Sequence, residues 1–109
     1  MNRSAQLDRS FLALSHPVRR AIVRRLAAGP ATVGEAARDA TVSKPAVTKH
    51  LKVLEEAGVI LRRVEGRTHV LSLRPRPLAD AEQWLELHRT LWEAKLDAVE
   101  RHLRKGPTT

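Results

Sequence analysis

The chain has 109 residues, a length that suits a single domain, and it has no cysteine, which excludes disulfides, thiolate metal sites and thiol redox switches. Its formal net charge of +8 favours a polyanionic partner, nucleic acid ahead of an anionic membrane. No apolar run reaches membrane-spanning length, and the opening MNRSAQLDRS lacks the apolar core of a signal peptide, so we expect a cytoplasmic protein with no membrane partner.

The charge is unevenly distributed along the chain. Residues 1–77 hold 15 Lys and Arg against 6 Asp and Glu, a net charge of +9, whereas residues 78–109 hold 5 against 6, a net charge of −1. We therefore expect the first two-thirds of the chain to bind the polyanion and the last third to have a different role.

Apolar residues at helical spacing predict two helices at the start of the chain. The first covers about residues 7–14. The second lies in SHPVRRAIVRRLAAG, where Ser15 or His16 is the expected cap and Gly29 the expected stop. Four arginines flank its apolar stripe: Arg19, Arg20, Arg24 and Arg25. Contact with phosphate and ordinary helix propensity explain these arginines equally well.

Two further helices follow, separated by a short turn. Thr32 and Glu35 form a capping box, in which each side chain satisfies a free backbone N–H at the start of the third helix. After a turn at about residues 40–42, Ser43 caps the fourth helix, which ends at Gly58.

The remaining elements are a hairpin and a long helix. VILRRVEGRTHVLSL is rich in β-branched residues around the turn signal Glu65-Gly66, which predicts a β-hairpin. RPRP at 74–77 interrupts the pattern, and from about residue 78 to 104 a helix runs without glycine or proline.

The order of these elements predicts a winged helix-turn-helix. The fold class is mainly α with a small β-hairpin, about five helices plus a two-stranded wing, in a dimeric protein. One domain spans residues 1–109, with the helix-turn-helix at about 32–57, the wing at 59–73 and a C-terminal dimerisation helix at 78–104.

The fourth helix carries the residue types that read a DNA groove. Lys44, Thr48 and Lys52 are four residues apart and share one face, with Lys49 beside them. Lysine can donate to guanine, and the threonine methyl can contact thymine. Ser43 and the free N–H groups at the helix start suit a phosphate. A solvated charged face is the alternative, but the adjoining helix, short turn and basic hairpin favour DNA binding by this constellation.

The hairpin is basic as well, with Arg62, Arg63 and Arg67 around its tip. Arginine at a wing tip can lie along a phosphate backbone or in the adjacent minor groove. The alternative is an edge strand that is charged to discourage aggregation.

The last helix is almost neutral and has a wide apolar face, which favours an oligomer contact. A partner's copies of the first helix, with Leu7 and Phe11, and of the last helix would cover it. Its near-heptad stripe consists of Leu85, Trp92, Leu96, Val99 and Leu103.

The stretch from SHPVRRAIVRRL through SKPAVTKHLKVLEEAGVI to EGRTHVLSL strongly resembles the ArsR family of bacterial winged-helix repressors, over about residues 7–104. The resemblance implies a homodimer that binds an imperfect palindrome and represses transcription. It implies recognition-helix contacts at Ser43, Lys44, Pro45, Thr48 and Lys49, and wing contacts at Arg62, Arg63 and Arg67.

The metal motifs of that family are absent or incomplete. No paired cysteines lie in TVGEAARDA, and on the last helix Glu86 and His88 are followed ten residues on by Val99 and then by His102. His88 and His102 would be about 21 Å apart along one helix, so they cannot share a metal within a chain. The chain therefore resembles the branch without metal ligands, whose members often repress only their own gene, and we expect no metal and no cofactor.

Two other functions remain open. One is a sensor repressor with a histidine-based metal or small-molecule site, and the other is a winged-helix module that binds protein. His50 and His69 are expected to be packing or surface residues, and His16 a helix-start residue. No nucleophile–base pair, phosphate-binding glycine loop or acid pair points to an enzyme.

Overall fold

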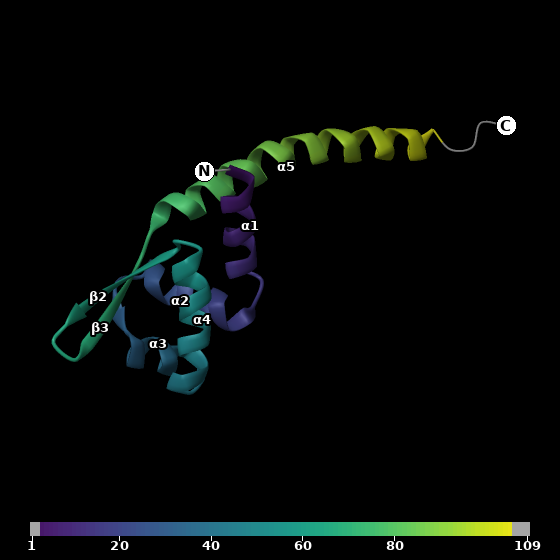
Figure 1. Cartoon of the computed structure of the whole chain (residues 1–109). Coiled ribbons are helices and arrows are strands. Elements are labelled where there is room, and N and C mark those ends of the chain that lie inside the picture. The colour runs from purple at the N-terminus through teal and green to yellow at the C-terminus, as the bar shows by residue number, and fades with distance from the viewer. Residues whose placement is uncertain (1–2, 106–109) are drawn as a thin grey trace.

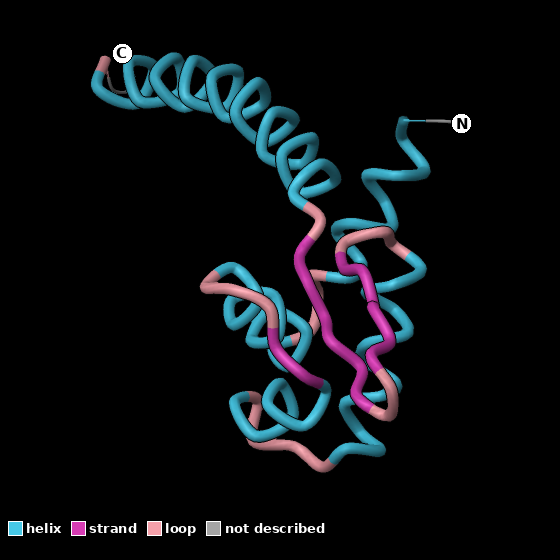
Figure 2. The backbone as a smooth tube through the Cα atoms, turned by 90° about the vertical axis from the view of Figure 1, so that its left-hand side faces the viewer, coloured by secondary structure: helices cyan, strands magenta, loops and turns pink. Residues whose placement is uncertain are grey.

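The computed structural model describes residues 3–105, which form five helices and three strands (Figures 1 and 2). The first four helices are α1 (Arg3–Ala13), α2 (Pro17–Ala27), α3 (Val33–Asp39) and α4 (Lys44–Glu56). A short strand, β1 (Ala31–Thr32), precedes α3. The hairpin strands β2 (Ile60–Glu65) and β3 (Thr68–Leu73) follow α4, and the chain ends in α5 (Pro75–Arg104). The predicted fold class, with five helices and a hairpin wing, is confirmed.

The predicted helix caps are present. The His16 Nδ1 accepts a hydrogen bond from the Val18 N–H at 3.1 Å, so His16 and not Ser15 caps α2. At α3 both halves of the capping box form, at 3.0 and 3.1 Å, between Thr32 and Glu35. The hydrogen bonds from Thr32 lower the pKa of Glu35, because they favour the carboxylate.

The sheet has one strand more than the sequence predicted. Its order is β1-β3-β2, all antiparallel, and Leu71 of β3 pairs with Ala31 on one side and Arg62 on the other. Glu65 pairs with Thr68, so the turn of the wing has Gly66 and Arg67 as its central residues. The φ of Gly66 is +63°, a value that favours glycine and suits a tight hairpin turn.

The core lies between α2, α4 and the sheet. Its largest fully buried apolar side chains come from one stripe of each helix, from the turn before β2 and from β3: Ile22, Val47, Leu51, Leu54, Val59 and Leu71. Burying a side chain of this size contributes about 1.5–3 kcal/mol, so these stripes fix the orientation of α4. The opposite face of α4 is thereby turned to solvent.

Two predicted boundaries were wrong. The first helix begins at Arg3 and not near residue 7, and the last helix begins at Pro75 and not near residue 78. Pro75 and Pro77 fall in the first turn of α5, where a missing N–H leaves no intrahelical bond unmade, so RPRP starts the helix.

Helix α5 projects far from the rest of the molecule (Figure 1). The molecule measures 75 × 33 × 21 Å, and its radius of gyration is 19.2 Å. A compact domain of this length would have a radius of gyration of about 13 Å. Only the start of α5 is held, by α1, where the rings of Phe11 and Trp84 meet edge-on at 5.7 Å. Within residues 3–105, no helix is both long and apolar enough to cross a membrane.

Candidate nucleic-acid interface

Helix α4 presents a polar face whose side chains are all in solvent. Its opposite face is anchored in the core by Val47, Leu51 and Leu54, which are fully buried. The exposed side chains are all six of those predicted to contact DNA from this helix and its cap: Ser43, Lys44, Pro45, Thr48, Lys49 and Lys52. The structure therefore gathers the predicted groove residues on one accessible surface.

Two hydroxyls of this surface already have local partners. The Ser43 Oγ accepts a hydrogen bond from the Ala46 N–H at 3.3 Å and serves as the helix cap. The Thr48 hydroxyl donates to the Lys44 carbonyl at 2.9 Å. Thr48 consequently offers a groove its methyl group and its oxygen lone pairs, and not a free donor.

The three arginines of the wing differ in what they are free to bind. Arg62 is held by Glu55, with Nη2–Oε1 at 2.6 Å and Nε–Oε2 at 3.3 Å, and its Nη1 lies 3.1 Å from the His69 Nδ1. Arg63 pairs with Glu65 at 2.8 Å but stays in solvent, its side chain 71% exposed. Arg67 lies at the tip, and its side chain has no ion pair with any described residue.

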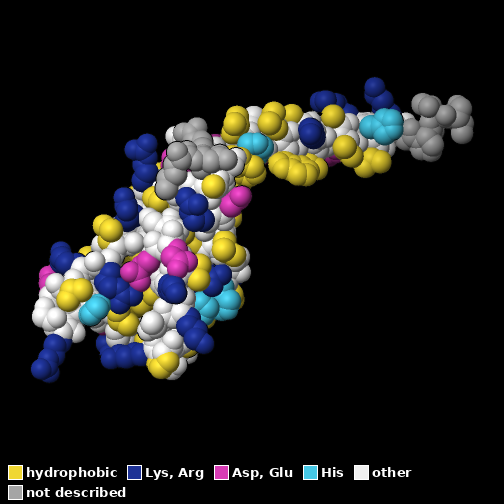
Figure 3. All heavy atoms as spheres, viewed as in Figure 1, with side chains coloured by type: hydrophobic (Ala, Val, Ile, Leu, Met, Phe, Trp, Pro, Cys, Tyr) yellow, Lys and Arg dark blue, Asp and Glu magenta, His cyan; other side chains and the backbone are white. Residues whose placement is uncertain are grey.

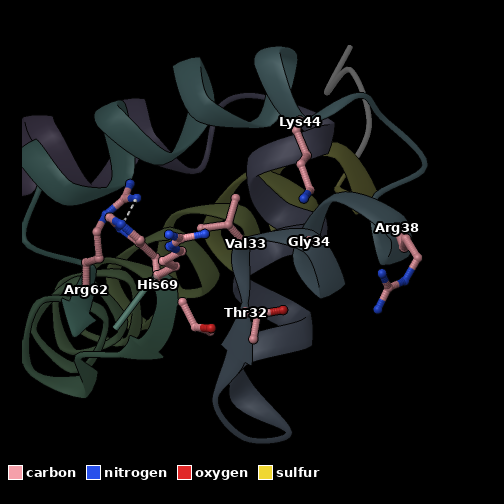
Figure 4. A pocket seen from close by; sticks show the side chains of 9 residues that line it. Thr32, Val33, Gly34, Arg38, Lys44, Arg62 and His69 are labelled. Atoms are coloured by element: carbon pink, nitrogen blue, oxygen red, sulfur yellow. Dashed lines mark hydrogen bonds between the residues drawn. The ribbon is translucent and has the colours of Figure 1, made fainter. Parts of the chain in front are cut away.

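A basic hollow of about 470 Å³ lies between the start of α4, helix α3 and the wing (Figure 4). No carboxylate lines it. A Cβ added to Gly34, on its α3 side, would lie 3.4 Å from the Lys44 Cε. Lys44 thus reaches across from α4 toward α3. The basic side chains of the lining come from α3, α4 and the wing: Arg38, Lys44, Arg62, Arg67 and His69.

Most of the arginines around α2 have structural partners. Arg19 donates to the carbonyls of Ala13 and Leu12 at 2.9 and 3.0 Å, and Arg20 donates to that of Leu14 at 2.8 Å. These bonds satisfy free carbonyls at the end of α1. A third arginine of this group, Arg25, forms an ion pair at 2.8 Å with Asp39 of α3. Arg24 alone of the four has neither a side-chain hydrogen bond nor an ion pair among the described residues, and it is exposed.

A histidine pair joins the start of α2 to α4. The rings of His16 and His50 lie with their centroids 4.4 Å apart, and the His50 Nδ1 is 3.2 Å from the Arg19 Nη1. Because arginine only donates, the His50 Nδ1 accepts, which favours the neutral ring. Burial, and then the nearby His16 and Arg19, lower the pKa of His50. His50 therefore has a packing role and His16 is a helix-start residue, both as expected.

Comparisons with known proteins agree with this geometry. A family model described as a helix-turn-helix domain matches residues 14–63. The HTH-type transcriptional regulator Rv2034 of Mycobacterium tuberculosis is 53% identical over 72 residues, which are 66% of this chain and 67% of the relative. The transcriptional repressor SdpR of Bacillus subtilis is 34% identical over 79 residues, 72% of this chain and 88% of the relative.

A solved structure is similar over almost its whole length. It is the crystal structure of the ArsR family transcriptional regulator RHA00566, with a TM-score of 0.76 and 37% identity over 84% of this chain and 95% of that chain. The chain belongs to the ArsR family. Its members are winged helix-turn-helix transcriptional regulators that bind double-stranded DNA, so the predicted family and general function are confirmed. The named relatives are regulators and not enzymes.

The histidines of α5 in this ArsR-family chain are engaged locally. His88 stacks on Trp84 with ring centroids 3.9 Å apart, and its Nδ1 is 2.8 Å from the Trp84 carbonyl, to which it donates. Glu86 pairs with Arg89 at 2.7 Å. Within residues 3–105, no three His, Asp or Glu side chains are grouped so that they could hold a metal ion.

Sequence reasoning missed two residues of the hollow, Gly34 and Arg38. Arg38 is four residues after Gly34, so both lie on one face of α3. The available signal was the glycine itself, because glycine in place of alanine within a helix costs about 1 kcal/mol and such a position often has a packing or functional reason.

Proposed function

We propose that the protein is a homodimeric repressor that binds a pseudo-palindromic operator in double-stranded DNA, with α4 in the major groove and the wing beside it. One domain spans the chain, in which α3 and α4 form the helix-turn-helix, β2 and β3 form the wing, and α5 joins two subunits. The residues proposed to contact DNA are Ser43, Lys44, Pro45, Thr48, Lys49, Lys52, Arg62, Arg63 and Arg67.

The exposed face of α4 carries the proposal. Three lysines and a threonine lie in solvent on it, while Val47, Leu51 and Leu54 anchor the opposite face. A protein-binding module would not need cations aligned beside a basic wing. The net charge of +9 over residues 1–77 supports phosphate attraction as the main source of affinity.

The dimer is supported by apolar surface that this chain leaves uncovered. Figure 3 shows apolar side chains gathered along α5, away from the body. The five residues of the predicted stripe are each more than half exposed: Leu85 52%, Trp92 63%, Leu96 57%, Val99 54% and Leu103 71%. Leu7 and Phe11 of α1 are partly exposed beside the start of α5. A soluble monomer rarely exposes such a row, and a second copy would bury it.

The dimer gives the proposal a geometric consequence. Two recognition helices related by a two-fold axis would meet half-sites about one DNA turn, ~34 Å, apart, so the operator should be a pseudo-palindrome. Repression is supported by the name of the relative SdpR, a transcriptional repressor. A repressor of this kind would block transcription by occupying its operator.

Selection from a random duplex pool tests the proposal. The wild-type protein should enrich a palindromic sequence, and its affinity for that sequence should fall steeply with salt. Arg67→Ala should weaken binding to the selected duplex and to unrelated duplexes alike. Failure to enrich any sequence, or an affinity that does not change with salt, would contradict the proposal.

A further inference from the structure

The basic hollow beside α4 has no carboxylate in its lining and contains cations that form no hydrogen bond or ion pair with the described residues. Within the described part of the chain, the side chains of Arg38, Lys44 and Arg67 form no hydrogen bond or ion pair. By contrast, Arg25, Arg62 and Arg63 each have a carboxylate within 2.8 Å. Three cations directed to one concave surface without an anion constitute a site for an anion that the chain does not itself supply.

Gly34 leaves the space between two of these cations open. The nearest atoms to a Cβ at this position would be the Lys44 Cε at 3.4 Å, the Lys44 Nζ at 3.7 Å and the Arg38 Nη1 at 3.9 Å. Figure 4 shows Lys44 pointing from α4 toward Gly34, with Arg38 on one side of the hollow and Arg62 and His69 on the other. A tetrahedral oxyanion placed over Gly34 would be within reach of both cations.

The far side of the hollow is held by contacts within the chain. Arg62 Nη1 lies 3.1 Å from the His69 Nδ1, and since arginine only donates, that nitrogen accepts. Glu55 holds Arg62 in place, so this wall of the hollow is fixed before any ligand arrives.

The position of the hollow identifies its occupant. The major and minor grooves of DNA are separated by one sugar–phosphate backbone. If α4 lies in the major groove and the wing in the neighbouring minor groove, that backbone passes between them, where the hollow lies. We infer that the hollow seats a backbone phosphate of the bound DNA over Gly34, between Lys44 and Arg38. The inference rests on the proposed function, and it makes Lys44 a phosphate ligand and adds Arg38 to the interface.

Two substitutions test the seat. Gly34→Ala fills the gap with a methyl group, and it should leave the melting temperature equal or higher because alanine favours the helix. Arg38→Gln removes one cation. Each phosphate contact contributes about 0.9 to the slope of log K against log salt, so losing one in each of the two half-sites should lower affinity about 60-fold at 0.1 M salt. The loss should be equal for the selected duplex and an unrelated one.

Arg101→Gln is the matched control. Arg101 is exposed on α5, on the side opposite the apolar stripe, and it has no ion pair among the described residues. The Arg101→Gln substitution removes the same charge far from the hollow. Its effect on affinity should be much smaller than that of Arg38→Gln.

Neutral methylphosphonate linkages, placed one at a time in the selected duplex, locate the phosphate. One position per half-site should weaken the wild-type protein about eightfold and should have little further effect on Arg38→Gln. If the wild-type protein selects a duplex with steep salt dependence, yet Gly34→Ala and Arg38→Gln bind it normally, the phosphate seat is refuted and the proposed function stands. If no duplex is selected, both the phosphate seat and the proposed function are refuted.

Inorganic phosphate distinguishes a free anion from DNA. If phosphate raises the melting temperature above that in chloride at equal ionic strength, Arg38→Gln abolishes the rise, and no methylphosphonate position matters, the hollow binds a free anion and the DNA assignment is overturned. A melting temperature that does not change with inorganic phosphate, together with one sensitive linkage, supports the assignment to DNA.

Discussion

The dimer can be tested by changing one side chain of the apolar stripe. Leu96 lies on α5, and 57% of its surface is exposed in the single subunit. Replacing it with glutamine keeps a residue that favours helices and removes the apolar surface. The fold of one subunit should therefore be unaffected, and only association should weaken.

The expected size of the effect follows from that exposure. Full burial of a leucine side chain contributes about 1.5–3 kcal/mol, so burial of the exposed 57% contributes about 0.9–1.7 kcal/mol. A two-fold interface contains each residue twice, which doubles the loss to about 1.7–3.4 kcal/mol. The dissociation constant of the dimer should rise by roughly 20- to 300-fold.

Sedimentation equilibrium over a range of concentrations measures this change, and circular dichroism checks that the helices remain. Leu61→Gln is the control, because Leu61 is 51% exposed on the wing, far from the proposed interface. A wild-type protein that sediments as a single 12.2 kDa chain at micromolar concentration would refute the reasoning. An unchanged dissociation constant in Leu96→Gln would refute the role of the stripe.

Four further predictions concern the interface, the caps and the histidines. In gel shifts, Thr48→Ala should reduce discrimination against mismatched duplexes by about 1–3 kcal/mol and leave nonspecific binding intact. In thermal unfolding, Thr32→Ala breaks the capping box and should cost about 1 kcal/mol, a fall of roughly 4–8 °C in Tm. Burial, with His16 and Arg19 nearby, lowers the pKa of His50, so the unfolded chain takes up this proton first as the pH falls. The free energy of unfolding should therefore decline below about pH 6.5 and level off below the folded-state pKa, with no contribution from His50 above pH 6.5. Zinc at modest excess should not release the protein from its operator.

Matched variants separate these effects from general destabilisation. Thr48→Val keeps a methyl group and removes the hydroxyl, so normal discrimination by this variant would assign the contact to the methyl. Thr32→Ser keeps the cap and should retain most of the stability. His50→Gln should flatten the pH profile, whereas the exposed His102→Gln should not; the opposite result would contradict the role of His50. Stoichiometric zinc binding with operator release would contradict the prediction that the protein does not respond to metal.

The elements and caps of this fold could be predicted because their causes are local. The capping box of Thr32 and Glu35, the cap at Ser43 and the buried stripe of α4 each depend on residues within one or two turns of each other. Periodicity and capping act at that range, so the sequence alone predicted α4 and its exposed basic face. The family resemblance rested on the same stretch.

The starts of the terminal helices and the strand β1 could not be read in the same way. Ala31 and Thr32 are a strand only because β3, about 40 residues later, offers them partners. RPRP is a break in an isolated sequence and a helix start here, because Pro75 and Pro77 occupy the first turn of α5. Both outcomes depend on the elements that follow these residues in the chain.

The tertiary structure alone decided which cations are free. By sequence, Arg62 and Arg67 are equivalent wing arginines, yet Glu55 of α4 and His69 of β3 hold Arg62, and Arg67 has no such partner. Lys44 and Arg38 belong to different helices, and they flank one gap only because α3 crosses α4 at Gly34. An ion pair depends on distances of a few ångströms between elements, and those distances are set by how the buried faces pack, which no local pattern encodes.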